Sequence, residues 1–279
     1  MVASSPGDGL KKSDKVRVKP DPPRGILNVR PAAAGDGLAL YSPSSDLDPF
    51  VEHYWIVRWD LTAPRVAETV PHPSVHMVLE AGRSEIVGVL RRKFSRVLAG
   101  RGWVVGTKFR PGGLRPFLAQ SVSALTDRRV RVQEVFGSRA LRLERDVFRC
   151  RDDMDALSAV ESFLLSRRPV PDEAMDLVGS ATARVANDRG ITRVDQLASE
   201  LHTTVRRLQR LFAEYVGVSP KWVIQRYRLL DAVERVASGA EVDWADLALE
   251  LGYADQAHFI GISRSSSAAP LATTPAAFR

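Results

Sequence analysis

Two short segments of the chain, fifty residues apart, have nearly the same sequence. Residues 197–201 read LASEL and residues 247–251 read LALEL, so four of the five positions agree. In each copy two leucines and an alanine recur at the spacing that places them on one face of a helix. A match of five residues can arise by chance, so its weight depends on whether the surrounding sequence repeats as well.

Each of the two segments is followed by a turn and a second helical pattern. After the first segment comes a short polar turn, and then Thr204 stands at the position expected of a helix N-cap. Apolar residues recur at helical spacing through residues 208–215. The second copy has a turn one residue longer, with Asp255 as the expected cap and Phe259 in place of Leu208. The pattern predicts two helix-turn-helix units.

A long amphipathic helix is predicted between the two units, in the sequence SPKWVIQRYRLLDAVERVA, with Pro220 in its first turn. This arrangement favours nucleic-acid binding, because a second helix with an exposed outer face fits the major groove of DNA. In the first unit that face carries Arg206, Arg207, Gln209 and Arg210. Arginine forms paired hydrogen bonds with guanine, and glutamine forms them with adenine. The alternative is a helical hairpin with a solvated arginine face, which the duplication makes the less favoured interpretation.

These residues resemble the DNA-binding domain of AraC-type transcriptional regulators over about residues 190–260. The matching features are L-A-x-E-L, L-x-R-L-F, G-V-S-P, R-x-R-L-x-x-A and A-x-x-L-G-Y-x-D-Q-x-H-F. The resemblance implies seven helices and two recognition helices that enter successive major-groove segments on one face of the duplex. It implies that the first helix reads bases through Arg206, Gln209 and Arg210. It implies that the second reads through Gln256, Ala257, His258, Ile260 and Gly261.

From these two lines of reasoning we expect a set of seven DNA-binding residues. Arg206, Gln209 and Arg210 are expected to read bases, and Thr204 and Arg207 to hold phosphates. The set is Thr204, Arg206, Arg207, Gln209, Arg210, Gln256 and His258.

The end of the chain departs from the family pattern at about Gly261, where a run of Ser, Ala and Pro replaces the expected apolar helix. Gly and Ser are poor helix formers, so we expect the second unit to be less stable than the first. One hypothesis is a displaced reading frame, because GISRSSSAA can be encoded so that another frame gives DFTVLVGRS, which resembles the family segment missing here. The terminal TTPAAFR resembles a family terminus, which leaves two alternatives: the frame is restored there, or the match is chance. The coding DNA tests the hypothesis of a displaced frame: an uninterrupted frame whose codons cannot give DFTVLVGRS would exclude it.

The region of residues 26–150 is expected to be β-rich, forming a sandwich or small barrel. The strands are predicted in EHYWIVRWDL, SVHMVLEAGRSEIVGVL and GRGWVVGTKF. A vaguer resemblance links it to the cupin-like sensor or dimerisation domain of some AraC-type proteins. Its aromatic and histidine residues either line an apolar pocket or, as we favour, belong to the core; they are Trp55, Trp59, His72, His76, Trp103 and Phe109.

The fold class expected is α+β, with four regions along the chain. Residues 1–25 are expected to be a disordered basic tail, and residues 151–180 a helical linker region. Residues 181–279 form the DNA-binding domain, with its atypical end from about residue 261.

Composition excludes several other classes of protein. The single cysteine, Cys150, excludes a disulfide framework and favours a reducing cytoplasm. No apolar stretch is long enough for a membrane span, and the net charge of +7 favours polyanionic partners only weakly. His53, His72 and His76 are expected to be structural or exposed rather than metal ligands, and no catalytic arrangement stands out.

We therefore interpret the chain as a cytoplasmic bacterial transcription factor that binds double-stranded DNA, with no cofactor, metal or enzymatic activity. A small-molecule effector in the N-terminal domain and a homodimer are compatible with this. The alternative is a small-molecule-binding β-domain whose DNA-binding module is defective. An enzyme built on the β-domain is a third option, which would require a bound metal.

Overall fold

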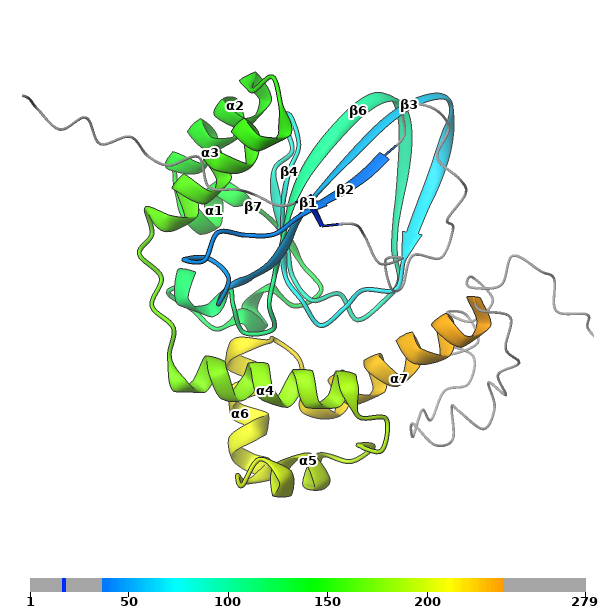
Figure 1. The fold of residues 1–279 in the computed structure, drawn as a ribbon, viewed down its shortest axis with the longest axis vertical. Coiled ribbons are helices and arrows are strands. Elements are labelled where there is room, and N and C mark those ends of the chain that lie inside the picture. Colours follow the sequence, from blue (N-terminus) through cyan, green and yellow to red (C-terminus); the bar gives the residue numbers. More distant parts are fainter. Residues whose placement is uncertain (1–16, 19–36, 238–279) are drawn as a thin grey trace, which may run out of the picture.

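The computed structural model describes residues 17–18 and 37–237, which form a β-sheet followed by a series of helices (Figure 1). The strands are β1 (Arg17–Val18), β2 (Gly37–Tyr41), β3 (Val51–Thr69), β4 (His76–Leu79), β5 (Glu85–Val87), β6 (Phe94–Phe109) and β7 (Arg129–Arg131). Two short 3₁₀ helices, η1 (Arg115–Phe117) and η2 (Val122–Leu125), lie between β6 and β7. The helices are α1 (Val132–Phe136), α2 (Arg139–Arg149), α3 (Asp153–Leu165), α4 (Glu173–Asn187), α5 (Val194–Glu200), α6 (Val205–Tyr215) and α7 (Pro220–Ala237).

The strands form one antiparallel sheet in the order β1-β2-β3-β6-β4-β5-β7. Strands β3 and β6 make a long antiparallel pair that continues beyond its neighbours and arches over (Figure 1). A register shift between Leu61 and Arg65 interrupts their pairing. Pro64 falls within this shift, where its missing N–H costs no ladder hydrogen bond.

The two faces of the sheet have separate apolar clusters, because successive strand residues point to opposite faces. On one face Tyr54, Ile56 and Phe109 are fully buried in the main core, which continues into the helices. On the other face a small cluster is centred on Trp59, Leu98 and Val104.

Two tryptophans on this second face lie directly over glycines. A Cβ added at Gly106 would lie 1.9 Å from the Trp55 ring, and one at Gly102 would lie 2.4 Å from the Trp59 ring. Both glycines are therefore required by the close approach of an indole to the backbone.

Helix α3 is bonded to the sheet rather than standing apart from it. Asp153 accepts a hydrogen bond from the Tyr41 hydroxyl (2.6 Å) and pairs with Arg58, while Glu161 accepts one from the Ser44 backbone N–H (2.9 Å). The predicted linker of residues 151–180 thus begins with a helix that packs on the β-domain.

The remaining helices, α4–α7, build a helical domain around apolar side chains such as Val178, Leu197 and Phe212. Asp172 caps α4 by accepting a hydrogen bond from the Met175 backbone N–H (2.7 Å). At the other end of α4, the buried Arg228 of α7 donates to the backbone carbonyls of Val185 and Asp188. This arginine therefore satisfies C-terminal carbonyls of α4 and fixes α7 against it.

The predicted division into an N-terminal β-domain and a C-terminal helical domain is confirmed. The structure differs from the prediction at two places. Residues 132–149, expected to be strand-rich, form the helices α1 and α2, and Arg17–Val18, within the predicted disordered tail, pair with β2 as strand β1. In the described ranges no helix combines the length and apolarity that crossing a membrane requires.

Candidate nucleic-acid interface

Helices α5 and α6 form a helix-turn-helix at the end of the molecule away from the sheet (Figure 1). The turn is tight because His202 adopts a left-handed backbone conformation, with φ of 48°. The backbone N–H of Thr203 then returns to the carbonyl of Ala198 (2.9 Å). The hydroxyl of Thr204 accepts a hydrogen bond from the Arg207 backbone N–H (3.1 Å), so the predicted N-cap of α6 is confirmed.

The two faces of α6 have opposite character. Its inner face is made by the buried side chains of Leu208, Leu211, Phe212 and Tyr215. The sequence-predicted residues Thr204, Arg206, Arg207, Gln209 and Arg210 are all exposed.

The outer face of α6 is available for a partner. Arg206, Arg207 and Arg210 form no side-chain hydrogen bond or ion pair within residues 17–18 and 37–237. Three cations on the first turns of a helix, with free N–H groups beside them, make a surface suited to an anion. The structure thus brings together five of the seven predicted residues; Gln256 and His258 lie outside the described residues.

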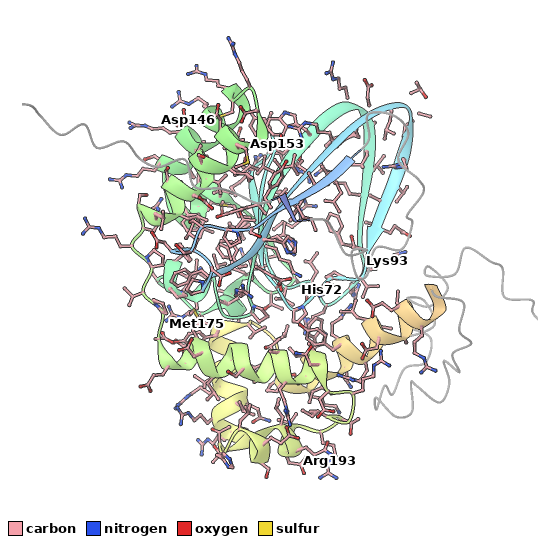
Figure 2. The ribbon with its side chains drawn as sticks, viewed as in Figure 1. His72, Lys93, Asp146, Asp153, Met175 and Arg193 are labelled. Atoms are coloured by element: carbon pink, nitrogen blue, oxygen red, sulfur yellow. The ribbon has the colours of Figure 1, made fainter. Side chains whose placement is uncertain are left out.

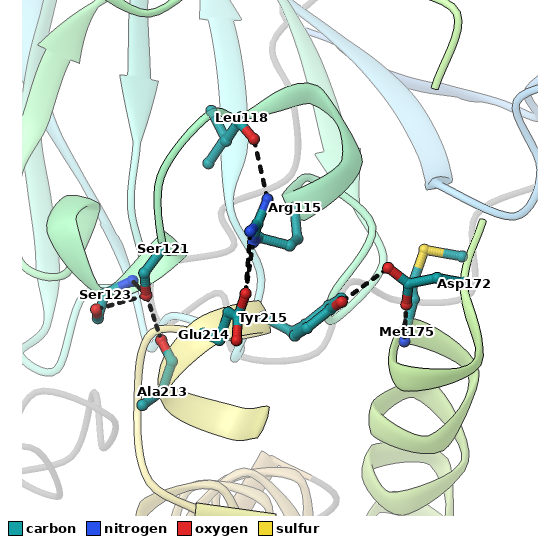
Figure 3. Close-up of polar contacts among 9 residues, drawn as sticks. All are labelled: Arg115, Leu118, Ser121, Ser123, Asp172, Met175, Ala213, Glu214 and Tyr215. Atoms are coloured by element: carbon teal, nitrogen blue, oxygen red, sulfur yellow. Dashed lines mark hydrogen bonds and ion pairs between the residues drawn. The ribbon is translucent and has the colours of Figure 1, made fainter. Parts of the chain in front are cut away.

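The opposite end of α6 is attached to the β-domain, as Figure 3 shows. The Arg115 guanidinium pairs with the Glu214 carboxylate (2.9 Å) and also donates to the Leu118 carbonyl (3.0 Å). The Ser121 hydroxyl donates to the carbonyl of Ala213 (3.0 Å).

Two further hydrogen bonds fix this end of the helix. The Thr126 hydroxyl donates to the carbonyl of Gly217 (2.6 Å), just after α6. The Tyr215 hydroxyl donates a hydrogen bond to Asp172, the cap of α4 (2.7 Å), and burial together with this bond raises the Tyr215 pKa to about 12. We call the contacts of Arg115, Ser121 and Thr126 with residues 213–217 the α6 seam.

Helix α7 also touches the β-domain. Arg226 donates to the carbonyl of Arg91 (2.7 Å), and the rings of His72 and Tyr227 meet edge to face with centroids 6.5 Å apart. The recognition-helix candidate is thus held at its C-terminal end and exposed at its N-terminal end.

The aromatic and histidine residues singled out in the β-domain are divided between the two faces of the sheet. Trp103 packs on Phe148 of α2, and Phe109 is in the main core. Trp55 and Trp59 are on the opposite face, where the Trp55 indole N–H donates to Nδ1 of His76 (3.2 Å). The six residues therefore do not share one pocket.

Burial is the main cause of the lowered pKa values of two histidines beside this face, His53 and His76. It lowers the pKa of His53 from 6.5 to about 4, helped by the nearby charge of Lys108, and lowers that of His76 well below its usual value. In the part of the chain that the structure describes, no group of three or more His, Cys, Asp or Glu residues is arranged to hold a metal ion.

Sequence reasoning missed the α6 seam entirely. Its partners are separated by more than 90 residues, and no local pattern links them. The glycine of the G-V-S-P motif was the one local signal of this contact. Gly217 has a φ of 93°, and a Cβ there would lie 2.7 Å from the Thr126 hydroxyl oxygen, so the position requires glycine.

Two family models match the sequence. Residues 39–131 match a domain of unknown function, DUF6597, and residues 197–275 match a helix-turn-helix domain, HTH_18. The second match extends past residue 261, where the sequence departs from the expected pattern. No curated protein is detectably similar to the chain.

Among solved structures, the similar ones include ToxT from Vibrio cholerae. ToxT from strain O395 is 11% identical with a TM-score of 0.33, covering 76% of this chain and 92% of that one. An apo ToxT variant from strain SCE256 is 13% identical with a TM-score of 0.30, covering 76% and 93%. Similarity this low supports no conclusion about the fold or function of this chain. The family match and the sequence motifs instead show that residues 197–275 are an AraC-type helix-turn-helix domain.

Proposed function

We propose that this protein is a sequence-specific transcriptional regulator in which α6 is the recognition helix of the first of two DNA-binding units. An AraC-type helix-turn-helix domain supports a DNA-binding transcriptional regulator. The observation that carries the finer proposal is the exposed face of α6, where three arginines and a glutamine stand without intramolecular partners within the described residues.

The spacing on α6 assigns a role to each residue. Arg206, Gln209 and Arg210 are three and four positions apart, so they share one helical face and would meet neighbouring bases along the groove. Thr204 and Arg207, in the first turn, would hold phosphates beside the free N–H groups of the helix start.

The second unit would read an adjacent major-groove segment, about 34 Å along the duplex, through Gln256 and His258. Its altered sequence after residue 261 leads us to expect that it adds less affinity than the first unit. An effector in the β-domain and a homodimer also remain parts of this proposal.

Selection of bound DNA from a random pool, with the full chain, tests the proposal. Arg210→Ala should then weaken binding to the selected site by about 1–3 kcal/mol and relax the preference at one base position. The matched control is Arg101→Ala, which changes an exposed arginine of strand β6. It should leave the affinity and the base preference unchanged. Equal weakening by Arg210→Ala on all sequences would make it a phosphate contact instead.

The alternative function, a small-molecule-binding β-domain with a defective DNA module, makes the opposite prediction. No sequence should then be enriched from the pool, even at low salt, where phosphate contacts are strongest. That result would overturn the regulator proposal.

A further inference from the structure

We propose that the outer face of α2, formed by Leu141, Arg142, Arg145 and Arg149, is a docking surface for an acidic protein segment that carries an apolar side chain. This surface belongs to the β-domain. It is separate from the DNA-binding face of α6, and the proposal stands whether or not α6 binds DNA.

The periodicity of α2 places these four residues together. The helix buries Ala140, Leu143 and Val147 against the core. At 100° per residue the opposite face is formed by residues 141, 142, 145 and 149. The three arginines are exposed, and the Leu141 side chain is 50% exposed beside them.

The positive charge of this face is not neutralised by ion pairs within the described residues. Arg142, Arg145 and Arg149 form no ion pair or side-chain hydrogen bond within the described ranges. They are three, four and seven positions apart, so like charges face one another along the helix. Several other arginines of this domain are paired with carboxylates, among them Arg58 with Asp153 and Arg129 with Glu85.

The carboxylates near α2 do not neutralise this face. Glu144 is engaged with the backbone N–H of Gly82 (2.8 Å). Asp146 is exposed on the flank of the helix but is within ion-pair distance of none of these arginines. Asp152 caps α3 by accepting from the Asp155 backbone N–H (2.8 Å). Carboxylates supplied by a partner would relieve the repulsion, and arginine forks bind them bidentately.

The exposed leucine favours a protein partner over nucleic acid. Arginine beside an apolar anchor is typical of protein interfaces, whereas a phosphate backbone offers nothing to a leucine side chain. The α2 surface also lies far from the helix-turn-helix: Asp146 on α2 and Arg193 before α5 are at opposite ends of the molecule (Figure 2). The chain's own N-terminal tail has the wrong charge, because residues 1–25 contain six basic and three acidic residues.

Fluorescence anisotropy with the purified full chain tests this, using as probe a labelled acidic peptide of Glu-Glu-Leu-Glu repeats. The double variant Arg145→Glu, Arg149→Glu should weaken peptide binding by about tenfold or more, because repulsion replaces attraction. Leu141→Ala should weaken it about threefold or more, since it removes the apolar anchor. The control Arg92→Glu, Arg101→Glu makes the same change of charge elsewhere and should stay within about twofold of the wild type.

Three outcomes would overturn the proposal. If the control pair weakens peptide binding as much as Arg145→Glu, Arg149→Glu does, the effect comes only from the change in net charge. If Leu141→Ala binds the peptide as tightly as the wild type, the face is a nonspecific site for polyanions. Displacement of the peptide by random-sequence duplex DNA, in the wild type and equally in a variant with α6 neutralised (Arg206→Ala, Arg210→Ala), would assign the face to nucleic acid. Circular dichroism of each variant confirms that α2 remains folded.

Discussion

At the scale of single residues, the Thr204 hydroxyl caps α6 and is also proposed to hold a phosphate. Its oxygen accepts the hydrogen bond from the Arg207 backbone N–H, and its own O–H remains able to donate to a phosphate. Thr204→Ala should therefore lower the free energy of unfolding by about 1 kcal/mol and also weaken DNA binding. Thr204→Asp should keep the cap and the stability but repel phosphates, so DNA binding should fall on every sequence. Denaturant unfolding and a DNA-binding titration separate the two effects, and normal DNA binding by Thr204→Asp would exclude the phosphate contact.

A second residue, His53, makes stability depend on pH. Burial lowers its folded-state pKa from 6.5 to about 4, so at pH 5 the unfolded chain takes up a proton that the folded chain does not. Stability is therefore complete above pH 6.5 and falls as the pH approaches 4. His53→Gln should reduce the stability loss between pH 7 and pH 5 by about 2 kcal/mol. Urea unfolding at both pH values measures this, with His202→Asn, an exposed histidine on the helix-turn-helix turn, as control. An unchanged pH slope in His53→Gln would contradict the assignment.

At the scale of elements, the turn after α6 depends on Gly217. Its φ of 93° is unfavourable for any side chain, and a Cβ would lie 2.7 Å from the Thr126 hydroxyl oxygen and 3.1 Å from the Val122 carbonyl oxygen. Gly217→Ala should lower the free energy of unfolding by about 1–3 kcal/mol. Adding Thr126→Ala should recover only part of this, because the backbone strain and the Val122 contact remain. Full stability in Gly217→Ala, measured by denaturant unfolding, would show that the seam can shift without cost.

The elements of the helical domain were predictable because their signals are local. The helices α5, α6 and α7 follow from apolar residues three and four positions apart, from the cap at Thr204 and from Pro220. Helix α2 carries an equally clear pattern, with buried residues at positions 140, 143 and 147, but it was included in a strand-rich region and missed. The predicted strand segments EHYWIVRWDL and GRGWVVGTKF cover only part of β3 and β6, since sequence pattern does not reveal that two strands pair over most of their length. The exposed face of α6 follows from the same local periodicity, while the seam at its other end requires knowledge of long-range contacts.

At the scale of the whole molecule, the α6 seam and the contacts of α7 with Arg91 and His72 join the β-domain to the helical domain. The Arg115–Glu214 ion pair is partly exposed and contributes at most about 1 kcal/mol. The Ser121 hydroxyl satisfies the Ala213 carbonyl, which the end of α6 leaves without an intrahelical partner, and the Thr126 hydroxyl satisfies the Gly217 carbonyl just after the helix.

The two domains should therefore unfold together in the wild type and separately once the seam is cut. The triple variant Arg115→Ala, Ser121→Ala, Thr126→Ala removes about 2–4 kcal/mol of coupling by the usual values for such bonds. Calorimetry of the wild type should show one transition, and the triple variant should show two, with the helical domain expected to melt first because it loses the caps on α6. Arg129→Ala, which breaks the Arg129–Glu85 pair inside the sheet, is the control and should leave a single transition. If the triple variant keeps one transition at an unchanged temperature, the seam does not couple the domains, and α6 is then positioned by its own domain alone.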